Sequence, residues 1–254
     1  MRDLVQHLWD ARRLGHTIDA AACDPPKTVE EAYAVQDGIV ALSGFARSGY
    51  KVGSTSKEAQ QLLGTDEPGA GVLLQPYVYD SPAQVTVVPA NVPLVEGEFA
   101  FRMARDLPPR AAAYTMAEVT SAIGSVAGAI EVVGTRFSGG LSGKGRLLTT
   151  ADCGVNVALV TGPWVKWSAH DFRSHEVTMT INGIKKGYGT GSRALGDPHN
   201  VVLWLANHLS ARGIGLKEGE IISTGTCTGI DAVHPGDVAR ADFGPLGAVE
   251  ISFK

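Results

Sequence analysis

The run LVEGEFAFRM, residues 94–103, constrains the fold more than any other stretch, because it alternates like a strand and yet carries two acids. Residues two apart share a face of a strand, so Glu96 and Glu98 point the same way, and the apolar neighbours Val95 and Phe99 indicate at least partial burial. Two like charges on a buried face repel and lose hydration, which is unfavourable unless a cation compensates them. Hard divalent ions such as Mg²⁺ are held by oxygen ligands of this kind. The alternative is that this face meets solvent, as one face of many antiparallel sheets does.

A third acid strengthens the case for a metal site. Glu131 lies in VAGAIEVVGTRF, where no other charged residue occurs between Glu118 and Arg136. An acid in such an apolar run is rarely buried unless it is paired or bound to a metal. If this strand pairs with the first, three carboxylates converge. Otherwise Glu131 lies exposed on an edge strand or forms a salt bridge with Arg136 or another base.

Two further stretches could contact a ligand. Lys51, in SGYKVGSTSKEA, precedes a helix start rich in Ser and Thr, where it could bind an anionic substrate or move a proton. The alternative is a solvated loop lysine. Thr226 lies in ISTGTCTGI, whose small residues and hydroxyls could hold a carboxylate, unless the segment is only a tight turn.

The order of predicted elements favours an α+β fold, with helices dominating the first 65 residues and strands dominating after about residue 84. Three helix starts fit the capping box, namely Thr28 with Glu31, Thr55 with Glu58 and Thr115 with Glu118, and Asp197 with Pro198 predicts a fourth. The elements do not alternate as βαβ units, which argues against a doubly wound sheet. We expect a helical region, residues 1–65, packed on a β-rich catalytic body, residues 66–254, as one structural domain.

Composition excludes several classes of function. The net charge is −4 in 254 residues, which offers no basic surface for nucleic acid or anionic lipid. No apolar run approaches the roughly 20 residues of a membrane span, and the N-terminus lacks the apolar core of a secretory signal. Three widely spaced cysteines favour a reducing compartment, and we expect a cytoplasmic protein. The chain also lacks the phosphate-loop and GxSxG patterns.

The segments YKVGSTSK, VEGEFAF, AIEVVGTRF, ISTGTCTGI and HPGDVARADFGPLGAVEISF together resemble the 2-keto-4-pentenoate hydratase group of the fumarylacetoacetate hydrolase superfamily. The likeness extends from about residue 28 to the end. It implies a mixed β-sandwich roll with an N-terminal helical region, and a homo-oligomer. It also implies Mg²⁺ or Mn²⁺ held by Glu96, Glu98 and Glu131, with Lys51 and Glu96 as catalytic residues. Lys51 and Thr226 would bind the substrate.

The activity implied by the resemblance is metal-dependent addition of water to a short 2-hydroxydienoate or 2-oxoenoate acid through a stabilised enolate, as in aromatic catabolism. Hydratases of this group usually have Asp and Phe where this chain has Gly69 and Ala70, and Asn where it has Cys153. Asp66, Glu67 or a water on the metal could replace the missing base. The alternatives are a 4-oxalocrotonate-type decarboxylase, an acylpyruvate C–C hydrolase and a catalytically silent protein that binds an oxo acid.

Overall fold

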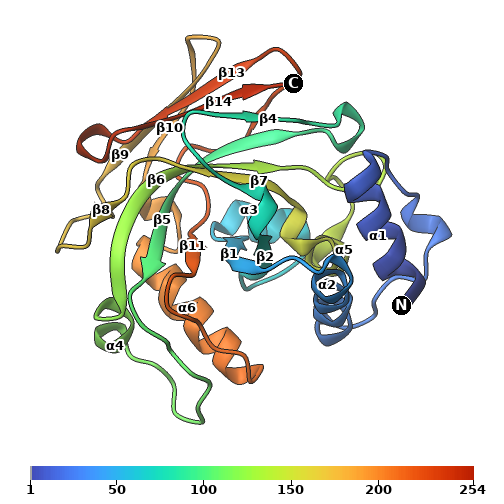
Figure 1. Ribbon diagram of the computed structural model, residues 1–254, viewed down its shortest axis with the longest axis horizontal. Helices are drawn as coiled ribbons and strands as arrows, with labels where there is room; N and C mark the ends of the chain where they lie inside the picture. The colour runs from blue at the N-terminus through green and yellow to red at the C-terminus, as the bar shows by residue number, and fades with distance from the viewer. Residues whose placement is uncertain (1) are drawn as a thin grey trace.

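The structure is a computed structural model that describes residues 2–254, and it consists of two β-sheets with helices packed against them (Figure 1). The helices are α1 (Arg2–Leu14), α2 (Val29–Ser43), α3 (Lys57–Leu63), α4 (Met116–Thr120), α5 (Gly145–Ala151) and α6 (Pro198–Ala211). The strands are β1 (Arg47–Gly53), β2 (Gly69–Leu74), β3 (Val78–Asp80), β4 (Ala83–Val85), β5 (Leu94–Met103), β6 (Ile123–Val133), β7 (Asn156–Thr161), β8 (Val165–Lys166), β9 (Glu176–Ile181), β10 (Ile184–Thr190), β11 (Ile221–Ser223), β12 (Asp231–Ala232), β13 (Val238–Asp242) and β14 (Ala248–Phe253).

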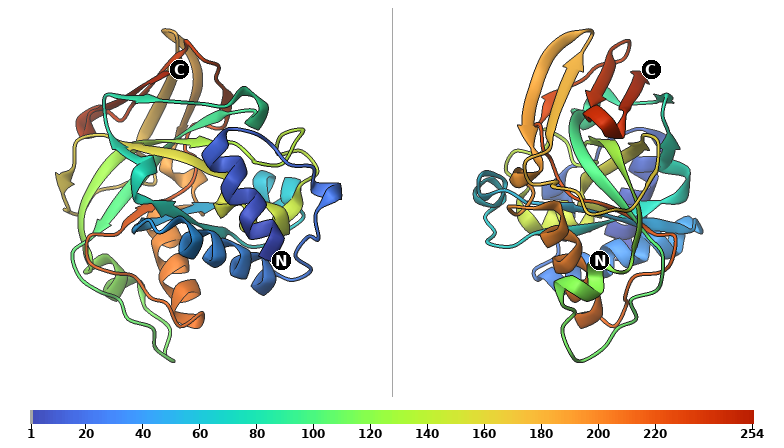
Figure 2. Two further views of the ribbon diagram at one scale, coloured as in Figure 1. Left: turned by 45° about the vertical axis from the view of Figure 1, so that its right-hand side comes forward. Right: turned by 90° about the vertical axis from the view of Figure 1, so that its left-hand side faces the viewer.

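Both sheets are mixed. The larger one has the order β2-β1-β11-β5-β6-β7-β3, with β12 beside β5 and β8 beside β6, and the smaller one has the order β10-β9-β13-β14-β4. Three pairs, β1 with β11, β3 with β7 and β4 with β14, are parallel, and the others are antiparallel. In Figures 1 and 2 the small sheet lies at the top with the C-terminus, and the N-terminal helices lie lower, against the large sheet. The predicted α+β class, with mixed sheets and an N-terminal helical region, is confirmed.

Aromatic side chains fill the space between the sheets. The Phe99 ring of β5 lies 5.5 Å from the Phe243 ring and 5.1 Å from the Phe172 ring, both in edge-to-face contact. A Cβ added at Gly128 of β6 would come within 2.2 Å of the Phe243 ring, so only glycine permits this approach. The face of β5 that carries Phe99 thereby anchors the strand against the small sheet, and its other face is left for the two glutamates.

Local chemistry explains most of the helix starts. Thr115 and Glu118 form the complete capping box of α4, Thr28 accepts a hydrogen bond from the Glu31 backbone, and Asp197 caps α6. The prediction that Thr55 caps a helix is wrong, because Ser56 caps α3. Thr55 is instead buried, and a Cβ added at Gly225 would collide with its hydroxyl. Packing against the segment that follows β11 therefore takes Thr55 out of the capping position.

The N-terminal region contributes a strand as well as helices. Strand β1 lies within residues 1–65, yet it pairs with β2 on one side and β11 on the other, inside the large sheet. Helices α1 and α2 bury apolar side chains such as Leu8 and Ile39 in the main core. The division at residue 65 stays a prediction. Among the described residues, no helix is both long and apolar enough to span a membrane.

Candidate metal and substrate site

Strand pairing brings the three predicted glutamates together. In the antiparallel pair β5–β6, Glu96 lies directly opposite Glu131, and Glu98 lies opposite Ala129, so it is the diagonal neighbour of Glu131. One carboxylate oxygen from each of the three lies within 4.8 Å of the others. The exposed fractions are 8% for Glu96 and 0% for Glu98 and Glu131. The alternative of a solvated face is thereby excluded for these side chains.

Neighbouring strands fix the orientation of two of these carboxylates. Glu98 Oε2 accepts hydrogen bonds from Ser223 Oγ at 2.5 Å and from the Gly225 backbone N–H at 2.9 Å, whereas its buried Oε1 has no donor among residues 2–254. Glu131 Oε1 accepts a hydrogen bond from Asn156 Nδ2 at 2.8 Å. Both glutamates are therefore held rigidly, and the free oxygen of Glu98 lacks the partner that a buried carboxylate oxygen requires.

Lys51 is the cation nearest to the cluster. Its Nζ lies 3.1 Å from Glu131 Oε2 and donates a hydrogen bond to the Gly154 carbonyl at 3.0 Å, and the side chain is almost fully buried on β1. Arg136, the alternative partner for Glu131, instead pairs with Asp152 at 2.5 Å. Lys51 is thus a buried residue beside the carboxylates and not a solvated loop lysine.

The charges in this cluster do not balance. Burial raises the pKa of Glu96 to about 7 although Lys51 opposes the shift, and burial together with Glu131 and Glu96 raises the pKa of Glu98 well above its usual range. Burial would lower the pKa of Lys51, but attraction to Glu131, Glu96 and Glu98 raises it instead. One cation faces three acids. Their oxygen-only donor set and the unpartnered Oε1 of Glu98 fit a hard divalent ion such as Mg²⁺ or Mn²⁺.

Mg²⁺ is expected to raise the melting temperature of the metal-free protein, and to raise it more at pH 8 than at pH 5. The folded, metal-free protein keeps protons on these carboxylates that the unfolded chain has released, so its stability falls as the pH rises from the ordinary Glu pKa of 4.5 to about 7. The ion binds the deprotonated carboxylates and offsets that loss, by about 2.7 kcal/mol at 100 times its Kd. Differential scanning fluorimetry with and without Mg²⁺ measures this. An equal shift at both pH values would contradict a site made of these glutamates.

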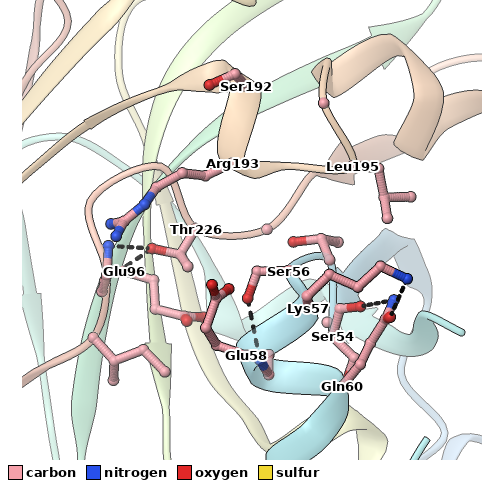
Figure 3. Close-up of a pocket in the computed structure, with 17 residues that line it drawn as sticks. Ser54, Ser56, Lys57, Glu58, Gln60, Glu96, Ser192, Arg193, Leu195 and Thr226 are labelled. Carbon is pink, nitrogen blue, oxygen red and sulfur yellow. Dashed lines mark hydrogen bonds between the residues drawn. The ribbon is translucent and has the colours of Figure 1, made fainter. Parts of the chain in front are cut away.

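Two adjoining cavities open beside the cluster. The inner one, about 110 Å³, is lined by Lys51, Glu96, Gly69 and Arg146 together with apolar side chains. The outer one, about 800 Å³, is bordered by the start of α3 on one side and by Arg193 and Thr226 on the other (Figure 3). Glu96 lines both cavities. A small acid entering through the outer cavity can therefore reach Glu96 and Lys51.

The Thr226 segment has a structural role at this site. The Thr226 hydroxyl donates to the Gly229 carbonyl at 2.8 Å and accepts from the Gly229 N–H at 2.9 Å, and the residue lines the outer cavity. The earlier part of the same run, Ser223 and Gly225, holds Glu98. Substrate binding by Thr226 stays a prediction.

The two side chains proposed to replace the missing Asp, Asp66 and Glu67, are both exposed. Gly69 lines the inner cavity, so the position itself belongs to the site. Glu67 pairs with Arg146 at 3.2 Å and is 54% exposed, which places its carboxylate toward solvent. Cys153 is buried, and burial raises the pKa of its thiol to about 11, so it is no nucleophile at neutral pH.

Sequence reasoning missed several residues of the site, above all Asn156, Arg146 and Arg193. Asn156 had a detectable signal, because it is the only polar residue in the apolar run VNVALV, residues 155–160, most of which lies in β7. Its backbone carbonyl accepts hydrogen bonds from Arg12 Nη1 at 2.6 Å and Arg136 Nη1 at 2.9 Å. These two arginines therefore hold the residue that orients Glu131.

Comparisons with known proteins agree with this geometry. Residues 49–254 match the family described as fumarylacetoacetate (FAA) hydrolase C-terminal. The chain is 31% identical to the 2-hydroxyhexa-2,4-dienoate hydratase of Comamonas testosteroni, over 98% of this chain and 95% of that protein. It is also 31% identical to a 2-keto-4-pentenoate hydratase of Paraburkholderia xenovorans (strain LB400), over 99% and 94%.

A solved structure shares the whole fold. It is 4-oxalocrotonate decarboxylase from Pseudomonas putida G7, complexed with magnesium and adipate. The TM-score is 0.90 at 27% sequence identity, and the match covers 100% of this chain and 97% of that one.

Proposed function

Because this chain belongs to the fumarylacetoacetate hydrolase C-terminal family, we propose that it is a divalent-metal-dependent lyase that adds water to a short 2-hydroxydienoate or 2-oxoenoate acid. The observation that carries this proposal is the buried set of Glu96, Glu98 and Glu131, with Lys51 beside it at the wall of a cavity. The two relatives at 31% identity are hydratases, which favours addition of water over the other reactions that such a site supports.

The chain's own residues would divide the work as follows. Glu96, Glu98 and Glu131 would hold Mg²⁺ or Mn²⁺, which supplies Lewis-acid stabilisation of the negative charge that develops on a 2-oxo acid. Lys51 stays protonated at neutral pH because its pKa is raised, so it binds the substrate carboxylate or donates a proton. Glu96 is the least buried of the three acids and lines both cavities, so it lies nearest to the substrate and can move a proton.

The second candidate is decarboxylation of a 2-oxo-3-ene dioate at the same site. It is favoured by the close match to the decarboxylase structure and by the small pair Gly69 and Ala70 at the inner cavity. Hydrolysis of an acylpyruvate has less support, because no histidine is among the residues that line either cavity. A silent relative would not need the buried, unpartnered carboxylate oxygen of Glu98.

Product analysis separates these reactions. With Mg²⁺ and 2-hydroxypenta-2,4-dienoate, we expect loss of the ultraviolet absorbance of the dienol and a single hydrated acid as product, since both hydratase relatives act on acids of this kind by name. A chelator should stop the reaction, and re-addition of Mg²⁺ should restore it. Release of CO₂ from 4-oxalocrotonate without hydration would favour the decarboxylase. If there were no turnover of either substrate and no response to the chelator, both the hydratase and the decarboxylase proposals would be wrong.

The proposal also includes a cytoplasmic location and a homo-oligomer. Large apolar side chains such as Ile184, at 62% exposed, and Tyr188, at 47%, are uncovered on β10 in the single chain. Size-exclusion chromatography with light scattering gives the number of subunits.

A further inference from the structure

Arg146, at the start of α5, is a buried arginine that does not use all of its hydrogen-bond donors within the described residues. Its side chain is 8% exposed. Nη1 donates to Thr65 Oγ1 at 2.8 Å and to the Glu67 carbonyl at 2.9 Å, and Nη2 donates to Glu67 Oε1 at 3.2 Å. A guanidinium has five N–H donors, and the buried Nε–H has no acceptor among residues 2–254. A buried donor left in this state lacks the partner that such groups normally find.

The unpartnered Nε lies close to Gly69. A Cβ added at Gly69 would lie 3.4 Å from Arg146 Nε and 3.6 Å from Cζ, so the guanidinium lies over this glycine at the wall of the inner cavity. Gly69 of β2 pairs with Gly53 of β1, and a Cβ added at Gly53 would lie 3.4 Å from Lys51 Nζ. Directly opposite residues have Cβ positions about 5 Å apart, so Lys51 Nζ and Arg146 Nε lie within about 12 Å of each other.

The inner cavity thus has a cation at each end of this glycine pair. Its one carboxylate is Glu96, which belongs to the metal cluster, and the remaining lining is small or apolar, as at Val133 and Leu141. Glu67 reaches Arg146 from a half-exposed position and engages Nη2, so Nε–H has no acceptor among the described residues although Arg146 lines the cavity. Lys51 and the cluster can accept the carboxylate of a 2-oxo acid, and Arg146 then lies where the distal end of the same molecule arrives.

We propose that Arg146 binds a second carboxylate, so that the site prefers a dicarboxylic 2-oxo or 2-hydroxydienoate acid to a monoacid with an alkyl tail. This inference rests on the proposed function of the site. Charge-assisted hydrogen bonds from an arginine to a carboxylate give both affinity and direction, and an alkyl tail would leave the buried Nε–H without an acceptor. Arg146 is therefore the specificity-determining residue of the inner cavity.

Two stable ligands of equal chain length test this directly. 2-Oxoadipate and 2-oxohexanoate differ only in the distal carboxylate, and neither is a dienol. Isothermal titration calorimetry of the complete chain with Mg²⁺ is expected to show that 2-oxoadipate binds about 10- to 100-fold more tightly. Equal affinities in the wild-type protein would overturn the proposal.

The variants assign the preference to one residue. Arg146→Met should abolish the preference for 2-oxoadipate and leave the affinity for 2-oxohexanoate nearly unchanged. Glu67→Gln is the matched control, because it weakens the same anchoring contact at Nη2 but spares Nε–H, so the preference should remain. If Arg146 only anchors the turn at residues 65–67, both variants should lose stability and neither should change the ratio of affinities.

A second pair of variants leaves the arginine in place, in case Arg146→Met does not fold. Gly69→Asp would set a carboxylate beside Nε, which should engage the donor and remove the preference. Gly69→Ala adds the same Cβ at an ordinary contact distance without the charge, so the preference should persist. A preference that survives in Gly69→Asp would overturn the assignment to Arg146.

Failure of this inference is distinguishable from failure of the proposed function. Turnover of a dienoate without any preference between the two oxo acids would remove the role of Arg146 and leave the hydratase intact. A preference for 2-oxoadipate without turnover of mono- or dicarboxylic dienoates would support the distal carboxylate site and remove the hydratase.

Discussion

Glu98→Gln is expected to abolish metal binding and to lower turnover by roughly 1,000-fold, since Lewis-acid stabilisation by a bound ion is worth several kcal/mol. Glutamine keeps the shape of the side chain and can still accept from Ser223 and Gly225. It removes the charge of the carboxylate and puts an NH₂ group in place of Oε1, the Glu98 oxygen that has no donor, so the ion loses a ligand. Metal content by mass spectrometry and kcat measured with excess Mg²⁺ test both parts of this expectation.

The same variant should be more stable than the wild-type protein when both are metal-free at pH 8. Burial and the neighbouring Glu131 and Glu96 disfavour a charge at Glu98, and glutamine removes that charge. Mg²⁺ should then raise the melting temperature of the wild type only. Glu250→Gln, on the exposed face of β14, is the control and should bind metal normally. If metal content and melting temperature of Glu98→Gln equalled those of the wild type, the three-glutamate site would be wrong.

Lys51→Met is expected to lower turnover by about 10²- to 10⁴-fold while the metal still binds, because the variant loses a proton donor or carboxylate ligand but keeps all three glutamates. It also removes the cation 3.1 Å from Glu131. Leaving that carboxylate uncompensated should destabilise the metal-free protein at neutral pH by about 3–5 kcal/mol. Chemical denaturation with and without Mg²⁺ should show that the ion recovers much of this loss.

Lys166→Met, on the exposed strand β8, controls for the loss of one positive charge and should change neither turnover nor stability. The two site variants should differ in metal binding. Glu98→Gln should lose metal and activity together, and Lys51→Met should lose activity and keep metal. If Lys51→Met retained full turnover, Lys51 would have only a structural role beside Glu131.

The local pattern was sufficient to predict the strand that carries the acids. The alternation of LVEGEFAFRM defined β5 at the bounds that the structure shows, and the isolation of Glu131 among apolar residues indicated its burial. Asn-Gly at residues 182–183 is the sequence signature of a two-residue hairpin turn, and in the structure both residues adopt the positive φ values that this turn requires. These features depend on residues close together in the chain.

Long-range pairing accounts for what the sequence did not reveal. A solvated loop was the alternative for the Lys51 segment, yet Gly49 lies so close to β11 that an added Cβ would fall 1.9 Å from the Ile221 carbonyl oxygen. That glycine permits close contact between two strands. In the sequence alone, such a glycine cannot be distinguished from one in a flexible loop. Arg146 follows a Gly/Ser-rich stretch, and nothing local indicated that it would face Gly69, 77 positions earlier in the chain.

The hydrogen bond from Arg12 to the Asn156 carbonyl limits which segments of this protein can be exchanged with those of a relative. The family match begins at residue 49, so Arg12 of α1 lies outside it. Arg12 nevertheless donates a hydrogen bond to the backbone of Asn156, whose side chain orients Glu131. Helix α1 is therefore part of the scaffold of the proposed metal site. Chimeras between relatives should exchange α1 together with β7, because a mismatched pair would disturb the proposed metal ligands without altering any residue that lines the two cavities.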